Sequence, residues 1–302
     1  MASLLGEVRE VARGWRWGRR PLVPRSAEPW APAPEPREFP TEWARTEAAR
    51  RVREAIHRYV LKPLVWSESE PRVHGLDHLE ALRGPVVFVA NHASHLDAPL
   101  ILCSLPRRWR ERTAVGAAAD YFFDVWWRAA GTALVFNAFP VERSGGRRLS
   151  DTPWRLLREG WNIVVFPEGT RSPDGWVGRF RPGAARLCTG AGVPAVPVAI
   201  RGTFAAMPRG RAWPRSGRHP VSVRFGPPLQ PRDGETNREF LDRLTEALAR
   251  LWDEDRNTWW RSLTEDGGDG RSAASGPDGP RWLRLWEASR PLPTIRGPRV
   301  WR

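Results

Sequence analysis

Two segments of the chain place polar side chains next to apolar runs, in patterns that can do chemistry. Residues 91–97, NHASHLD, follow the apolar residues 86–90 and contain His92 and Asp97 with four residues between them. Residues 166–172, FPEGTRS, follow a second apolar run with a carboxylate, a glycine and an arginine. A carboxylate bound to one ring nitrogen of a histidine fixes the tautomer and leaves the other nitrogen to take a proton. The first segment can therefore make a hydroxyl nucleophilic, and the second can bind an anion beside it.

The rest of the sequence favours direct base catalysis over a covalent enzyme intermediate. No serine lies in a G-x-S-x-G segment, and neither Cys103 nor Cys188 stands in a pattern that pairs it with a histidine. Two cysteines are too few for a disulfide framework, and no Cys/His spacing matches a zinc site, so we expect no metal. His92 would then deprotonate a substrate hydroxyl that attacks a thioester. Histidine and aspartate at this spacing also occur with a purely structural role, so the pair alone does not decide the function.

Short apolar runs alternate with helical patterns through the middle of the chain. This alternation predicts an α/β fold with a mixed, largely parallel sheet covered by helices. In such sheets ligand sites form at the carboxyl ends of the strands, where both segments lie. We expect strands at 86–90, 112–116, 133–136, 163–166, 193–200 and 221–225, and helices at 98–105, 154–159, 183–188 and 236–252.

The charge and the tryptophan content favour an anionic partner. The 302 residues carry a net charge of +14, and many of the 18 tryptophans lie near arginines in the terminal thirds. Because tryptophan favours membrane–water interfaces as well as protein cores, these rings either contact an anionic membrane surface or pack internally. No apolar run is long enough to span a bilayer, and the N-terminal residues lack the pattern of a secretory signal. We therefore expect a peripheral protein on the cytoplasmic face of the cell membrane.

Four segments in order resemble the motifs of the glycerolipid acyltransferases, typified by the 1-acylglycerol-3-phosphate acyltransferases. Residues 91–97 resemble the first motif, H-x-x-x-x-D, and residues 166–172 the third, F-P-E-G-T-R-S. Residues 196–200, VPVAI, are similar to the fourth. Residues 139–143, FPVER, match the second more loosely, because the glycine that usually precedes it is replaced by Asn137 and Ala138.

This resemblance implies an O-acyltransferase that makes phosphatidic acid from lysophosphatidic acid in phospholipid biosynthesis. It implies that His92 is the general base, oriented by Asp97, and that the acyl donor is a thioester of coenzyme A or of acyl carrier protein, without a cofactor. The phosphate end of 1-acylglycerol-3-phosphate would be held by substrate-binding residues of the third and second motifs. These are Glu168, Gly169, Thr170, Arg171 and Arg143.

Periodicity and composition, together with the motif positions, indicate how the chain is divided, with amphipathic helices toward the N-terminus. A helix over 41–65 carries an apolar stripe that includes Val52 and Tyr59 on an otherwise basic surface. The predicted parts are a basic amphipathic helix at 1–20, a proline-rich linker at 21–40, the acyltransferase domain at 41–264 with its motifs in 72–230, a flexible linker at 265–280, and a tail rich in tryptophan and arginine at 281–302.

Several alternatives stay open on the sequence. The acceptor can be another lysophospholipid, a glycolipid or an aminolipid, and the charge is also compatible with a nucleic-acid-binding protein or an inactive membrane scaffold. Arg179 and Arg181 either add positive charge near the phosphate or lie on a solvated surface. Ser94 and His95 are interpreted as residues that fix the loop. Residues 121–127 either line an apolar groove for the acyl chain or form a core helix.

Overall fold

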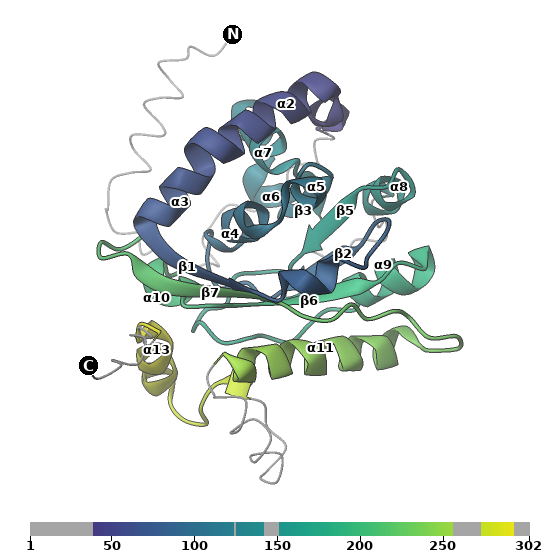
Figure 1. Ribbon diagram of the computed structural model, residues 1–302. Coiled ribbons are helices and arrows are strands. Elements are labelled where there is room, and N and C mark those ends of the chain that lie inside the picture. Colours follow the sequence, from purple (N-terminus) through teal and green to yellow (C-terminus); the bar gives the residue numbers. More distant parts are fainter. Residues whose placement is uncertain (1–38, 124, 142–150, 256–272, 293–302) are drawn as a thin grey trace, which may run out of the picture. The chain divides into compact units, whose positions relative to one another are not determined.

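The computed structural model describes residues 39–123, 125–141, 151–255 and 273–292 (Figure 1). Within these ranges seven strands form one sheet. Their bounds are β1 (Ser69–His74), β2 (Val87–Ala90), β3 (Thr113–Ala118), β4 (Phe139–Val141), β5 (Asn162–Val165), β6 (Ala195–Arg201) and β7 (His219–Phe225).

The sheet is mixed and largely parallel, as predicted. The strand order is β1-β7-β6-β2-β5-β3-β4. The block β6, β2, β5, β3 and β4 is parallel throughout, whereas β7 runs antiparallel to β6 and β1 pairs in parallel with β7. The first and third motifs follow β2 and β5, which are neighbours, and the fourth motif lies in β6 on the other side of β2. This topology therefore brings three motifs to one edge of the sheet.

Helices connect the strands and cover both faces of the sheet (Figure 1). One of them, residues 237–254, buries Phe240, Leu244 and Leu248 on a single stripe and begins with a capping box formed by Thr236 and Glu239. The α-helices are α2 (Glu47–Ile56), α3 (Lys62–Glu68), α4 (Asp97–Ser104), α5 (Arg107–Arg110), α6 (Ala119–Phe122), α7 (Trp126–Phe136), α8 (Thr152–Arg158), α9 (Gly183–Ala191), α10 (Thr203–Ala206), α11 (Asn237–Glu254) and α13 (Arg281–Ser289), and shorter helical turns are η2 (Glu42–Arg45), η3 (His57–Leu61), η4 (Leu76–Leu79) and η5 (Ala273–Ser275).

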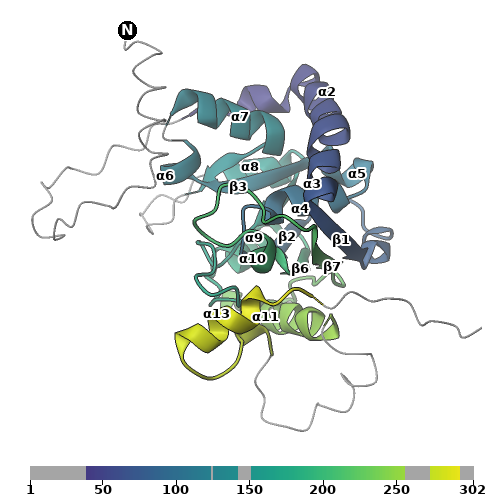
Figure 2. The same ribbon diagram turned by 90° about the vertical axis from the view of Figure 1, so that its left-hand side faces the viewer.

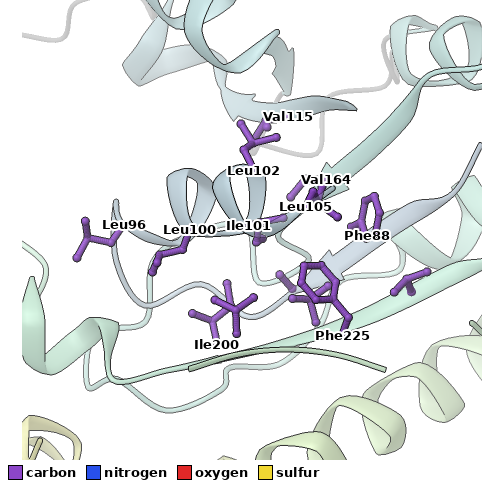
Figure 3. Packing of buried hydrophobic residues seen from close by; sticks show 14 of the residues in the cluster. Phe88, Leu96, Leu100, Ile101, Leu102, Leu105, Val115, Val164, Ile200 and Phe225 are labelled. Carbon is purple, nitrogen blue, oxygen red and sulfur yellow. The ribbon is translucent and has the colours of Figure 1, made fainter. Parts of the chain in front are cut away.

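The core lies on both sides of β2, all of whose residues are buried. Phe88 and Ala90 belong to the cluster that α3 and α4 cover, where Leu100 and Ile101 of α4 pack over the sheet (Figure 3). The alternate residues Val87 and Val89 belong to the opposite cluster, which α9 and α11 cover. A strand buried on both faces reads as a continuous apolar run, which is why the sequence located it correctly.

The strand expected at 133–136 was wrong, because these residues form the last turn of α7. A short apolar run does not distinguish a strand from a buried helix. The helix ends at Asn137, which has a left-handed backbone with φ of 48° and is fully buried. Asparagine is one of the few residues besides glycine that adopt this conformation readily. Asn137 therefore supplies the left-handed turn before the second motif, in a region where glycine is usual.

Polar side chains of α2 and η3 bind the C-terminal end of α7. Arg53 Nε donates to the carbonyl oxygen of Leu134 at 2.7 Å, and His57 Nε2 lies 2.6 Å from that of Val135. Both side chains are buried, and burial lowers the pKa of His57 below its ordinary value. The last carbonyls of a helix lack intrahelical partners, so these contacts satisfy them.

The helical segment predicted at 41–65 is present as η2, α2, η3 and the start of α3. Its apolar stripe faces outward, since Tyr59 and Val60 are 69% and 58% exposed. Among the helices that the structure describes, none is both long and apolar enough to cross a bilayer. The predicted helix at 1–20 and nearly all of the linker at 21–40 lie outside the described residues.

Candidate active site

The first motif begins where β2 ends, and its first residue fastens it to β6. The Asn91 side chain donates to the carbonyl oxygen of Ile200 at 2.9 Å and accepts from the Ile200 N–H at 2.8 Å. The parallel neighbour β5 ends in the same layer, with Val165 opposite Val89. Both predicted segments therefore lie at the carboxyl ends of adjacent strands.

His92 and Asp97 form a hydrogen-bonded pair. Asp97 Oδ2 lies 2.8 Å from His92 Nδ1, and it also accepts the backbone N–H groups of Ala93 and Ser94, each at 2.8 Å. Asp97 is fully buried, whereas the His92 side chain keeps 19% of its surface exposed. The imidazole stacks on Phe166 of the third motif, with ring centroids 4.2 Å apart. The pair therefore leaves Nε2 as the nitrogen that can exchange a proton with a substrate.

The two polar residues between His92 and Asp97 have different surroundings. Ser94 is fully buried, and its hydroxyl donates to the carbonyl oxygen of Met207 at 2.8 Å. His95 stacks on Tyr121, with ring centroids 5.7 Å apart. Burial, together with the nearby charges of Arg171 and His92, lowers the pKa of His95 to about 4. Ser94 thus ties the turn to the segment after α10, and His95 is a neutral side chain at physiological pH.

Glu168 lies behind the histidine turn. Its Oε1 accepts the backbone N–H of His92 at 2.8 Å, and its Oε2 accepts that of Gly178 at 3.0 Å. A Cβ atom on Gly178 would lie only 2.8 Å from Oε2, so this position has no room for a side chain unless Glu168 moves. Burial raises the pKa of Glu168 to about 7. The carboxylate therefore connects the first motif to the end of the third-motif loop, which we define as residues 166–178.

This raised pKa makes a prediction for stability. Glu168 takes up its proton more readily in the folded than in the unfolded chain, so its contribution to stability is complete below pH 4.5 and is lost as the pH rises through about 7. In the unchanged protein, the free energy of unfolding should fall by on the order of 3 kcal/mol across this interval. Glu168→Gln should remove this fall. Urea unfolding at a series of pH values measures it. Glu80→Gln, at an exposed position, is the control, and equal slopes for both variants would contradict the prediction.

The remaining third-motif residues lie beside the imidazole. Gly169 has a left-handed φ of 72°, and a Cβ atom there would lie 3.0 Å from the Cζ and Nε atoms of Arg181. The backbone of Arg181 is fixed by its N–H, which donates to the carbonyl oxygen of Pro167 at 2.9 Å. The guanidinium of Arg181 therefore lies against the loop that holds Thr170 and Arg171. Arg179 is exposed.

A pocket of about 770 Å³ opens in front of His92. Gly169, Thr170 and Arg171 line it, so the structure brings these predicted residues together with His92. Most of the remaining wall is apolar and comes from β3, α6 and α7, including Val115, Phe122 and Phe136. The predicted residue Arg143 lies outside the described residues. Within the described ranges, no group of three or more His, Cys, Asp or Glu side chains can hold a metal ion.

Three cationic residues of the pocket wall were missed in the sequence. Arg128 comes from α7, and Arg209 and Arg211 come from the loop that follows α10. Arg211 Nε also donates to the carbonyl oxygen of Trp213 at 3.4 Å. The only available signal was the arginine-rich run 209–218 a few residues beyond the fourth motif, and that run also suits a solvated loop.

Three features of the site can now be compared with known proteins: the largely parallel sheet, the hydrogen-bonded His92–Asp97 pair and the facing loop with Arg171. The Acyltransferase family model matches residues 70–201, which include both motifs of the site. The resemblance to the glycerolipid acyltransferases is thereby confirmed.

Two of the similar proteins are 1-acyl-sn-glycerol-3-phosphate acyltransferases of plants, and a third is a bacterial 1-acyl-sn-glycerophosphate acyltransferase. Over 169 residues the chain is 31% identical to the chloroplastic 1-acyl-sn-glycerol-3-phosphate acyltransferase BAT2 of Brassica napus, covering 53% of this chain and 46% of that protein. It is 30% identical over 167 residues to LPAT1 of Arabidopsis thaliana, covering 52% and 44%. The chain thus spans about half the length of these curated relatives. The crystal structure of the 1-acyl-sn-glycerophosphate acyltransferase PlsC from Thermotoga maritima superposes with a TM-score of 0.54 at 25% identity, covering 71% of this chain and 87% of PlsC.

Proposed function

We propose that the protein transfers a fatty acyl group from an acyl thioester to the free hydroxyl of 1-acylglycerol-3-phosphate, which gives phosphatidic acid. The observation that carries this proposal is the 2.8 Å contact between His92 Nδ1 and Asp97 Oδ2. The imidazole of this pair lines the largely apolar pocket. The activity given in the names of the similar proteins supports 1-acylglycerol-3-phosphate as the acceptor. The donor is a thioester of coenzyme A or of acyl carrier protein.

In this mechanism His92 Nε2 takes the proton of the acceptor hydroxyl as the oxygen attacks the thioester carbonyl carbon. The charge that develops on the imidazole is stabilised by the Asp97 carboxylate, which does not itself take the proton. When the tetrahedral intermediate collapses, the carbon–sulfur bond breaks and the imidazolium returns the proton to the thiolate. Ester and free thiol are then the products, and the histidine is regenerated.

The pocket has surfaces suited to both ends of a lysophospholipid. Gly169, Thr170 and Arg171 line it near His92, and an arginine binds phosphate through charge-assisted and often bidentate hydrogen bonds. The apolar wall of β3, α6 and α7 suits acyl chains. His92 would then face a hydroxyl that lies between a bound phosphate and a bound chain.

A panel of acceptors tests the proposal. The purified protein is incubated with acyl-CoA or acyl carrier protein donors and with lysophosphatidate, lysophosphatidylcholine, a glycolipid or an aminolipid, and thiol release is followed. We expect the highest kcat/KM for lysophosphatidate. Thiol release that requires no acceptor, or that is faster with an acceptor without a phosphomonoester, would reject this substrate assignment.

Arg171→Ala should separate the two substrates. Because one charge-assisted contact to phosphate is lost, we expect the KM for lysophosphatidate to rise roughly 10- to 100-fold while the KM for the acyl donor changes little. Initial rates at varied acceptor and donor concentrations measure both constants. Arg186→Ala, at an exposed position of α9, is the matched control. Equal increases in both KM values would contradict a role in phosphate binding.

We also propose that the protein works on an anionic membrane surface with the pocket side toward the lipid. α6 and α7 line the pocket, and the same two helices expose Tyr121, Trp126 and Trp127 by 48%, 67% and 46%. Exposed indole rings favour the membrane–water interface. Arg128 beside Trp127 adds positive charge, with its guanidinium carbon 5.4 Å from the indole centroid.

Trp126→Ser combined with Trp127→Ser should therefore weaken vesicle binding. We expect about a tenfold lower partition onto phosphatidylglycerol vesicles, since two large apolar rings no longer enter the interface. Sedimentation with vesicles measures the bound fraction. Trp282→Ser, which changes an equally exposed ring on α13, is the comparison. An equal loss for Trp282→Ser would show that docking is not confined to the pocket side.

A further inference from the structure

Helix α13 packs on the loop of the third motif although it is distant in sequence. Its residues 281–289 lie outside the segment 70–201 that matches the family model. Figure 2 shows α13 beside α10, at the same end of the sheet as the candidate site. The sequence predicted only a tail rich in tryptophan and arginine at 281–302.

Three contacts join α13 and the segment before it to the loop. Arg284 Nε donates to Asp174 Oδ2 at 2.6 Å, and the indole Nε1 of Trp176 donates to the carbonyl oxygen of Arg284 at 3.0 Å. Upstream of α13, the carbonyl oxygen of Ala274 accepts the backbone N–H of Val177 at 3.0 Å. The loop is therefore bound through both a side-chain ion pair and its backbone.

The packing between α13 and the loop is tight at Gly175. Gly175 has a φ of 85°, and a Cβ atom there would lie 2.7 Å from Ala288 Cβ and 2.7 Å from Phe204 Cγ. A small cavity of about 50 Å³ lies next to this contact, with Ala288 on one side and Ala93, the neighbour of His92, on another. This cavity thus lies between α13 and the turn that carries His92.

A chain of hydrogen bonds continues from α13 to the histidine. Asp174 Oδ1 accepts the Ser172 hydroxyl at 3.1 Å, and Ser172 Oγ in turn accepts the N–H of Gly175 at 2.9 Å. The backbone N–H of Ser172 donates to the carbonyl oxygen of His92 at 2.7 Å. Burial raises the pKa of Asp174, but the hydrogen bonds from Arg284, Trp176 and Ser172 outweigh this and hold it below its ordinary value. Asp174 is therefore anionic at neutral pH and keeps its ion pair with Arg284.

We propose that α13 is a working part of the active site and that Arg284 is a positioning residue for the third-motif loop. The Arg284–Asp174 pair holds residues 172–178 in the conformation that presents Arg171 to the acceptor and supports the backbone of His92. Arg284 does not touch substrate in this proposal. It acts through Asp174 and Ser172, and the kinetic consequences rest on the proposed acyl transfer.

The test compares Arg284→Ala with Arg281→Ala, which removes the same charge from an exposed position of the same helix. Hydrogen exchange of the full-length protein is measured first, because it does not depend on activity. We expect Arg284→Ala to speed exchange of the backbone N–H groups at 172–178 about tenfold, the effect of losing one hydrogen bond between charged groups, while Arg281→Ala leaves them unchanged. Equal exchange in the two variants would overturn the proposal, whatever reaction the protein catalyses.

Steady-state kinetics and a double-mutant cycle complete the test. Arg284→Ala should lower kcat/KM for lysophosphatidate about tenfold with little change in the KM of the acyl donor. Asp174→Asn should have a similar effect, and the double variant should be no worse than either single one, because the two residues act as one unit. Additive losses, or a fall in kcat/KM that follows only a lower thermal midpoint, would reject Arg284 as a positioning residue. Faster exchange without acyl transfer in any variant would instead reject the proposed function and leave the coupling in place.

Discussion

Replacing His92 by alanine is expected to reduce kcat for acyl transfer roughly 10²- to 10⁴-fold, the usual contribution of a positioned general base. The imidazole is the group whose Nδ1 is bound to Asp97 and whose ring faces the pocket. Steady-state thiol release with lysophosphatidate as the acceptor measures the loss. Because the ring is partly exposed, its removal should leave the fold intact.

Two controls make this result specific. His78→Ala changes a histidine that lies outside the pocket and should keep full activity. Added imidazole should restore part of the activity of His92→Ala, because a small base can occupy the space of the lost ring. Turnover of His92→Ala within tenfold of the unchanged protein would show that another group takes the proton.

Replacing Asp97 by alanine is expected to lower kcat about 10³-fold and also to destabilise the fold by a few kcal/mol. A single oxygen, Oδ2, accepts from His92 Nδ1 and from the N–H groups of Ala93 and Ser94. All three donors lose their acceptor in the alanine variant. Steady-state kinetics together with urea unfolding separates the catalytic loss from the structural one.

Asp97→Asn distinguishes geometry from charge at this position. Only an oxygen fits where two backbone N–H groups converge, so the amide oxygen should replace Oδ2 and keep the tautomer of His92. The amide nitrogen then takes the place of Oδ1, which is buried and has no hydrogen-bond partner in the described part of the chain. We expect a smaller fall in kcat, about 10²-fold, from the missing charge alone. Unchanged kinetics for Asp97→Asn would contradict a role for the carboxylate charge, and kinetics identical to those of Asp97→Ala would contradict a separate role for the position of the oxygen.

The fold and the contact between His92 and Asp97 were predictable because local sequence patterns determine them. The apolar run of β2 is followed at once by Asn91 and His92, and that of β5 is followed by Phe166 and Pro167 and then by Glu168; an apolar run that gives way to polar residues marks the carboxyl end of a strand in a parallel sheet. The pairing of His92 with Asp97 follows from their spacing across one turn. Neither inference needs contacts between distant parts of the chain.

What the sequence did not reveal depends on such distant contacts. The hydrogen bonds of Glu168 join it to His92 and Gly178, and nothing in FPEGTRS distinguishes this arrangement from contact with a substrate. The buried positions of Arg53 and His57 reverse the usual preference of their residue types, because the end of α7 needs donors there. α13 has a helical pattern, but the surface that receives it is built by Asp174 and Trp176, more than a hundred residues earlier.

The stacked, half-buried His95 determines which measurements will depend on pH. With a pKa of about 4 it carries no charge between pH 5 and 9, so it adds no titrating cation to the pocket. The other basic residues that line the pocket, apart from His92, are arginines, which stay charged throughout this range. Affinity for the acceptor should then vary with pH mainly through the second ionisation of the lipid phosphate itself, near pH 6 for a phosphomonoester. The pH dependence of acceptor binding should therefore report the ionisation of the lipid.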